Sequence, residues 1–178
     1  KFVISRPAYW NGLIQEIKKV YKGKLTYAAN WDEFKRVPFW RQLDCIGIDA
    51  YFPVTDKKTP TIEEFEAGWR PHKIEIQKIQ HKFNKPILFT EYGYRSIDFT
   101  GKEPWDSKRI TGSINLLAQK NGLQAIHNQF WKEDWFLGGF IWKWFHKHTE
   151  VGGENNNRFT PQNKPAEVLL RSLYKQAP

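Results

Sequence analysis

Four short apolar segments, separated by stretches with helical periodicity, constrain the fold of this chain more than any other feature. They are Lys24–Trp31, Cys45–Phe52, Pro86–Tyr94 and Leu137–Phe145. Each segment is too short for a typical helix, and most are rich in β-branched and aromatic residues, which favours strands. The segments are apolar on both faces, as strands of a parallel sheet are. They therefore predict four parallel strands.

The stretches between these segments predict helices. Apolar residues at three- and four-residue spacing indicate a first helix that ends near Gly23: Trp10, Leu13, Ile14, Ile17 and Tyr21. Thr61 and Glu64 form a capping-box pattern that begins a second helix, which Pro71 is expected to break or restart. A third helix is expected over Ile110–Glu133, and a last one after Pro165. Alternating strands and helices predict an α/β fold with helical crossovers.

Composition fits a single domain over residues 1–178, with 40% hydrophobic and 16% aromatic residues. The net charge is +9, but the lysines are scattered, which favours a solvated surface over a polyanion site. The single cysteine, Cys45, excludes an intrachain disulfide and is expected in the core. No metal-ligand pattern and no apolar run near 18 residues is present, so we expect neither a metal site nor a membrane span. Because the chain begins at Lys1 and contains no Met, any targeting segment is expected upstream.

Polar and aromatic residues stand at the ends of the predicted strands. Asn30, Asp49, Tyr51, Glu91 and Trp142 all come late in their segments. In parallel α/β sheets and in eight-stranded barrels, ligands bind at the carboxyl ends of the strands. The carboxyl-end side of the sheet or barrel would then hold an amide, two carboxylates, a phenol and an indole close together. Such a set suits a neutral sugar, because a phosphate would require a Gly-rich loop or clustered arginines, and the sequence shows neither.

Strand alternation predicts which way these side chains point. Gly47, Asp49 and Tyr51 are expected to face the barrel interior, while Ile46, Ile48 and Ala50 face the helices. If Glu91 faces inward, Leu88 and Thr90 are expected to face outward. On the fourth strand, Phe140, Trp142 and Trp144 are expected to share one face.

Each of these residues also has a purely structural interpretation. Asp49 could satisfy backbone amides, and Tyr51 or Trp142 could fill the core. A carboxylate such as Glu91, buried at a strand end, needs a partner, which Arg95 or Tyr51 could provide without any catalysis. For the histidines we expect surface or loop positions: His127, His146 and His148.

Five ordered blocks of the sequence resemble glycoside hydrolase family 113, a group of β-mannanase-like enzymes. The blocks are "GKLTYAANWDEF", "LDCIGIDAYFPV", "KPILFTEYGYRS", "GGFIWKWF" and "FTPQNKPAE", and the likeness runs from Trp10 onward. The resemblance implies a (β/α)₈ TIM barrel with retaining chemistry and no cofactor. It also implies that the four predicted strands are strands five to eight with their helices, because a whole barrel needs about 250 residues.

The resemblance assigns roles to several residues. It implies that Glu91 is the catalytic nucleophile, that Tyr51 orients it and that Trp142 forms the floor beneath the attacked sugar. Asn30 and Trp31 are implied as substrate contacts, and Asp49 is a further candidate. The family's acid/base is a glutamate at the end of the fourth strand. No position of this sequence matches it, and Lys1 to Arg6 follow the place where it would lie.

Three functions follow as hypotheses. The first is retaining cleavage of β-1,4-mannosidic or related bonds, with this chain supplying the nucleophile. The second is a non-catalytic carbohydrate-binding remnant that lacks the acid/base, and the third is a basic polyanion-binding protein. The expected partners are an oligosaccharide or polysaccharide and either the N-terminal half-barrel or a second copy, with no nucleic acid. An extracytoplasmic or lipoprotein-anchored location is favoured over a cytoplasmic one.

Overall fold

One parallel sheet forms the centre of the computed structural model, which describes residues 2–108 and 113–175. Its strands lie in the order in which they occur in the chain. They are β1 (Ala28–Asn30), β2 (Ile46–Asp49), β3 (Ile87–Tyr92) and β4 (Phe136–Ile141). All neighbouring pairs are parallel, which confirms the four predicted strands and the α/β fold class.

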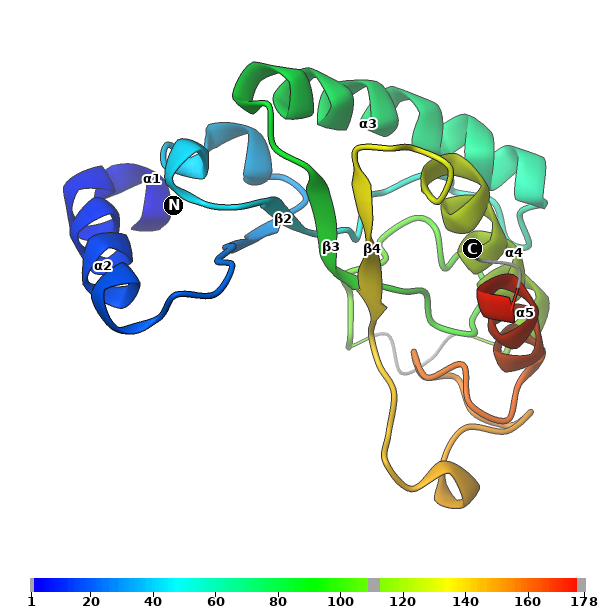
Figure 1. Ribbon diagram of the computed structural model, residues 1–178. Coiled ribbons are helices and arrows are strands. Elements are labelled where there is room, and N and C mark those ends of the chain that lie inside the picture. Colours follow the sequence, from blue (N-terminus) through cyan, green and yellow to red (C-terminus); the bar gives the residue numbers. More distant parts are fainter. Residues whose placement is uncertain (1, 109–112, 176–178) are drawn as a thin grey trace.

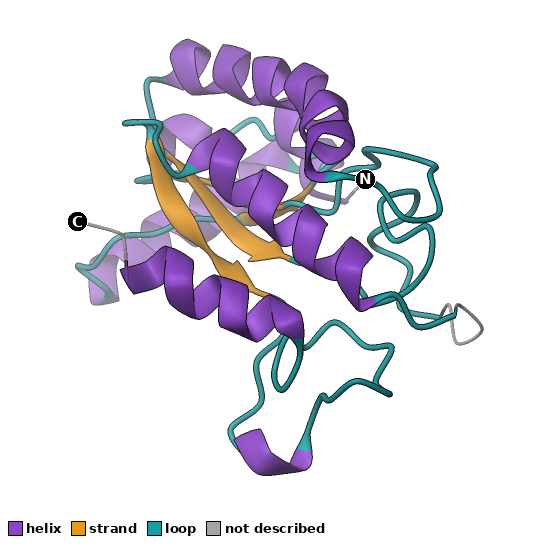
Figure 2. Ribbon diagram, turned by 90° about the vertical axis from the view of Figure 1, so that its right-hand side faces the viewer, coloured by secondary structure: helices purple, strands orange, loops and turns teal. Residues whose placement is uncertain are grey.

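Helices connect the strands and pack on one side of the sheet. Figures 1 and 2 show α3, α4 and α5 lying side by side over β3 and β4, while α2 lies near β1. The helices are α1 (Phe2–Ser5), α2 (Pro7–Val20), α3 (Ile62–Phe83), α4 (Leu116–Phe130) and α5 (Pro165–Lys175), with 3₁₀ turns η1 (Phe34–Arg36), η2 (Trp40–Gln42) and η3 (His148–Glu150).

Aromatic packing between the sheet and the helices makes the core. Phe89 of β3 is fully buried and stacks on Trp69 of α3 with ring centroids 6.2 Å apart. The same ring meets Phe130 of α4 edge-on at 4.9 Å and Phe136 of β4 at 4.8 Å. Edge and stacked contacts of this kind add to the area that the rings bury. This core fixes one face of β3 toward the helices.

Two helix predictions are wrong in detail. Helix α3 has the Thr61–Glu64 capping box, but it runs through Pro71 without ending. Proline removes one backbone donor, yet buried residues on both sides of it, Trp69 before and Ile76 after, keep the two halves packed against the sheet. Helix α4 begins at Leu116, because the Asn115 side chain accepts from the Ala118 amide and caps it there. Residues 109–112 of the predicted third helix lie outside the described residues.

The edge strand β4 exposes apolar side chains. Leu137 and Phe140 of β4 are 55% and 65% exposed. Strands β1 and β4 each have only one neighbour in the described sheet. Exposed apolar groups on a strand with an open edge favour contact with another polypeptide surface.

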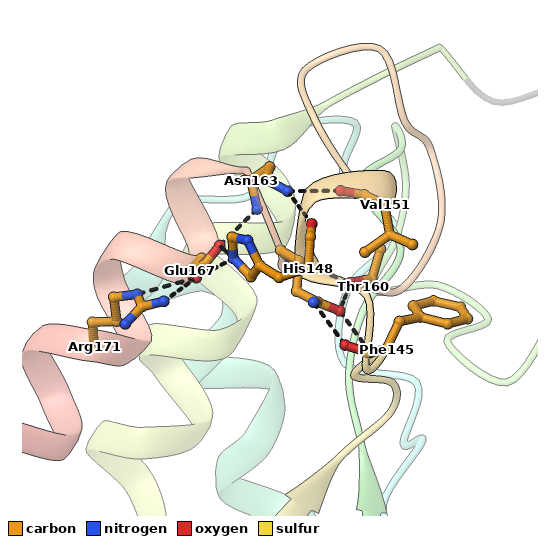
Figure 3. Close-up of polar contacts among 8 residues, drawn as sticks. Phe145, His148, Val151, Thr160, Asn163, Glu167 and Arg171 are labelled. Atoms are coloured by element: carbon orange, nitrogen blue, oxygen red, sulfur yellow. Dashed lines mark hydrogen bonds and ion pairs between the residues drawn. The ribbon is translucent and has the colours of Figure 1, made fainter.

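The long loop between β4 and α5 is tied to the first turns of α5 (Figure 3). The Glu167 carboxylate accepts hydrogen bonds from His148 Nε2 at 2.8 Å, from the Asn163 amide at 2.7 Å and from Arg171 Nη2 at 2.7 Å. The Asn163 side chain donates to the carbonyl oxygens of His148 and Val151. Burial alone would raise the pKa of the Glu167 carboxyl, but these donors outweigh burial and lower its pKa to about 2.

A second set of contacts fixes the same loop near the end of β4. Gln162 accepts from the Phe145 amide at 2.6 Å and donates back to the Phe145 carbonyl at 3.0 Å. The Thr160 hydroxyl donates to the same side-chain oxygen of Gln162 at 3.0 Å. The loop is therefore held at both ends, so residues 151–160 have a defined position next to the strand ends.

We predict that Glu167→Gln destabilises the protein by about 1–3 kcal/mol at pH 7, because charged hydrogen bonds around a buried group are lost. The pKa of Glu167 in the folded protein lies below its ordinary value of 4.5, so the stabilisation is present above pH 4.5 and is lost as the pH falls toward 2. Thermal unfolding followed by circular dichroism at pH 7 and pH 2.5 measures this, with the exposed Glu154→Gln as the control. If Glu167→Gln lowered the stability as much at pH 2.5 as at pH 7, the result would contradict a stabilising role for the negative charge of Glu167.

Candidate active site

The predicted polar residues lie in one row across the carboxyl ends of the strands. Asn30 of β1 pairs with Asp49 of β2 in the sheet register, and Asp49 pairs with Glu91 of β3. Tyr51 lies two residues after the end of β2. Trp142 directly follows β4, and its backbone amide donates to the Tyr92 carbonyl of β3 at 2.8 Å. The parallel register thus brings together residues that are far apart in the sequence.

Tyr51 and Glu91 form a direct hydrogen bond at the centre of this row. The Tyr51 hydroxyl donates to Glu91 Oε2 at 2.9 Å, and the tyrosine is 9% exposed. Burial raises the pKa of Tyr51 well above its ordinary value, and the bond to Glu91 raises it further. Tyr51 therefore stays protonated and donates to the carboxylate.

Asp49 lies beside this pair and has its own donor. The Thr90 hydroxyl donates to Asp49 Oδ1 at 2.8 Å. Burial raises the pKa of the Asp49 carboxyl, and the negative charge of Glu91 acts in the same direction, while Thr90 opposes both.

The prediction that Leu88 and Thr90 face outward is wrong. Ile87 and Phe89 are fully buried toward the helices, whereas Thr90 reaches Asp49 on the other face. The register shifts between Ile48 and Asp49, so that Asp49 is paired with Glu91. This irregularity lets the consecutive residues Thr90 and Glu91 both contact groups of the β2 end, which simple alternation does not allow.

Trp142 is 41% exposed and lines a cavity of ≈ 430 Å³ beside the strand ends. Its position next to β3 depends on Gly93, because a Cβ atom there would lie 2.4 Å from the Trp142 carbonyl oxygen. The predicted shared face of Phe140, Trp142 and Trp144 is not observed. Phe140 and Trp144 instead line a groove against α5, because β4 ends at Ile141 and the alternation does not continue.

Trp31, at the end of β1, has a partner that the sequence analysis missed. Its ring stacks on Trp105 with centroids 5.0 Å apart and planes 24° apart, and it also contacts Phe52. Trp105 is 43% exposed and comes from the loop between β3 and α4. The available signal was an isolated tryptophan in the polar stretch "GKEPWDSK".

The sequence analysis also missed a cluster of basic residues at the cavity. Arg95, Lys143 and Arg158 line it, and the buried Lys164 lies behind it. The expectation that arginines do not cluster is therefore wrong for the folded chain, because these side chains come from separate loops.

The cysteine and two of the histidines make contacts that belong to the packing of the protein. Cys45 is a buried free cysteine. His127 stacks on Trp131, and His148 forms a hydrogen bond with Glu167.

Within residues 2–108 and 113–175, no three His, Cys, Asp or Glu side chains are grouped so as to hold a metal ion. None of the described helices is both long enough and apolar enough to span a membrane.

Solved structures with this fold include enzymes that act on carbohydrates. A GH113 β-1,4-mannanase, solved free and as a complex, superposes with a TM-score of 0.81 at 24% identity, over 98% of this chain and 52% of the mannanase. The GH113 β-mannanase AaManA from Alicyclobacillus acidocaldarius gives 0.77 at 26% identity, over 94% and 50%. A Faecalibacterium prausnitzii β-glucuronidase gives 0.64 at 15% identity, over 95% and 28%.

The chain thus spans about half the length of the mannanases that it matches, and its sheet with the covering helices is a partial (β/α) barrel. A comparison with curated protein sequences gives no match. The sequence model of Glycoside Hydrolase Family 113 matches residues 3–164, and this chain therefore belongs to that family.

Proposed function

We propose that this protein is a retaining β-glycosidase that cleaves β-1,4-mannan, and that this chain supplies the nucleophile Glu91. The observation that carries the proposal is the 2.9 Å hydrogen bond from the Tyr51 hydroxyl to Glu91. A donor on one carboxylate oxygen stabilises the ionised form and leaves the other oxygen to react. The mannanase structures of the same family support the choice of substrate.

In this mechanism Glu91 attacks the anomeric carbon, and the bond from that carbon to the leaving oxygen breaks. A second carboxyl gives its proton to the leaving oxygen. Water then attacks the glycosyl-enzyme, returns a proton to the second carboxyl and releases Glu91. In retaining enzymes the two carboxyl groups lie about 5–5.5 Å apart.

The remaining site residues would bind the sugar. Trp142 is 41% exposed next to the strand ends, and the half-buried Trp31 forms an aromatic pair with the exposed Trp105 at the end of β1. Asn30 and Asp49 stand in the same row as Glu91 and would bind sugar hydroxyls. Aromatic rings with a few placed polar groups are typical of a saccharide site.

We further propose that the acid/base comes from polypeptide other than these residues. The face of the sheet away from the helices and the open edges of β1 and β4 would be covered by the first half of the barrel or by a second copy. The superposition on about half of each mannanase supports this arrangement. A carbohydrate-binding protein without hydrolysis is the alternative if no acid/base is supplied.

Glu91→Gln should lower mannan hydrolysis by roughly a thousandfold or more, because nucleophile and acid act as a unit. Release of reducing ends from β-1,4-mannan by the natural protein measures the effect, and circular dichroism checks the fold. The exposed Glu16→Gln on α2 is the matched control and should keep full activity. Retained activity in Glu91→Gln would exclude Glu91 as the nucleophile.

Tyr51→Phe should lower the turnover number by about 10- to 1,000-fold and change KM little, because it removes a bond to the reacting group and leaves the sugar contacts. Steady-state kinetics on mannan separate the two constants. Tyr21→Phe, at a half-exposed tyrosine, is the control. If kcat is unchanged, the hydroxyl of Tyr51 has only a structural role.

The isolated 178-residue chain should associate with itself and should not hydrolyse mannan, because its open sheet face is apolar and its acid/base is missing. Light scattering and a mannan assay on the same sample measure both properties. A stable monomer would contradict the need for a covering half. Clear hydrolysis would show that a carboxyl of this chain, with Asp49 nearest to Glu91 in the register, acts as the acid.

A further inference from the structure

The cavity beside Trp142 is lined by more basic than acidic side chains. Its volume is ≈ 430 Å³, within the range of about 300–1,000 Å³ that is typical of small-molecule sites. Aromatic side chains form part of its wall, and three basic side chains form another part. These aromatic and basic lining residues are Arg95, Trp142, Lys143, Phe145, Arg158 and Phe159.

The basic side chains belong to a cluster that extends into the protein. Arg95 is 2% exposed, and its Nε donates to the Asn157 carbonyl at 3.2 Å. Lys164, 3% exposed, donates to three neutral oxygens: Ser96 Oγ, Asn156 Oδ1 and the Arg158 carbonyl. Burial and, to a smaller extent, the charge of Arg95 together lower the pKa of Lys164 to about 7, so the two side chains are close enough to repel.

The cavity lacks a matching negative charge. Its one acidic lining residue, Glu150, is paired with Lys147 at 3.3 Å. Within the described part of the chain, Lys143, Arg158 and Lys164 form no ion pair. Lys143 lies over the Phe145 ring at 4.6 Å and over the Trp142 ring at 5.5 Å. A bound anion would therefore gain from several cations that no described carboxylate neutralises.

The cavity adjoins the candidate active site without including its reacting group. Phe159 of the cavity wall contacts the Tyr51 ring edge-on at 6.1 Å, and Tyr51 bonds Glu91. Glu91 itself does not line the cavity. Trp142 belongs both to the strand-end residues and to the cavity wall, so a saccharide unit attacked at Glu91 over Trp142 would place its neighbouring unit among the basic side chains.

We propose that this cavity binds the carboxylate of an acidic sugar unit, of the uronic acid class, next to the attacked unit of the saccharide. The proposal rests on the proposed function, because it requires a saccharide at Glu91. It extends the proposed substrate from β-1,4-mannan to a β-linked saccharide in which a carboxylate-bearing unit lies next to the attacked unit. Guanidinium groups at the cavity suit a planar carboxylate, which they can bind through two parallel hydrogen bonds.

Ligand-observed NMR titration tests this on the natural protein with Glu91→Gln, which prevents cleavage. The probes are methyl β-mannoside, methyl β-mannuronide and methyl β-mannoside 6-sulfate, which differ only at carbon 6. We expect the mannuronide to bind at least about tenfold more tightly than the mannoside. Equal binding of these two, or no detectable mannuronide binding, would overturn the proposal. Equal or tighter binding of the sulfate would overturn the assignment to a carboxylate.

Variants locate the binding site. Lys143 and Arg158 are exposed, so the double variant Lys143→Gln/Arg158→Gln should fold and lose most of the preference for the mannuronide. Lys147→Gln changes an exposed lysine of the same loop that does not line the cavity, and it should keep the preference. If the double variant and Lys147→Gln changed the preference for the mannuronide equally, the proposal would be overturned. Hydrolysis of mannan by the wild-type protein is scored separately, so loss of the proposed activity and loss of the acidic site give different results.

Discussion

The packing of Phe89 against the helices determines where the chemistry of this protein can lie. Its ring is fully buried between Trp69 and Phe130, so this face of β3 belongs to the core. The polar residues that follow it in the chain must leave the core, since an unpaired buried charge is costly. The register shift at the end of β2 then lets both Thr90 and Glu91 meet groups of the neighbouring strand.

The order of strands and helices could be predicted from the sequence because it depends on local periodicity and on caps. The capping box of Thr61 is an example, since its two hydrogen bonds join residues only three apart. The predictions failed where tertiary packing decides the outcome. Pro71 stays inside α3 because buried residues hold both halves, and Thr90 turns inward because of an irregular register that alternation cannot reveal.

The row of Asn30, Asp49 and Glu91 was predictable, because parallel strands align their carboxyl ends. The basic cluster was not, because its members come from loops whose paths depend on distant contacts. Arg158 reaches the cavity only because the loop after β4 is fixed to α5 through Glu167 and to its own start through Gln162. No local pattern in the sequence records these contacts.

The two carboxylates at the strand ends differ in their hydrogen-bond donors. The buried Tyr51 keeps its proton and donates it in a hydrogen bond to Glu91 at 2.9 Å. Asp49 accepts instead from the Thr90 hydroxyl at 2.8 Å, and burial raises the pKa of the Asp49 carboxyl. Both carboxylates stand in one row on the same face, so in the proposed mechanism the proton donor to the leaving group would approach from across the open face. The surface that covers the exposed side of the sheet is therefore also the surface from which the second catalytic group would come.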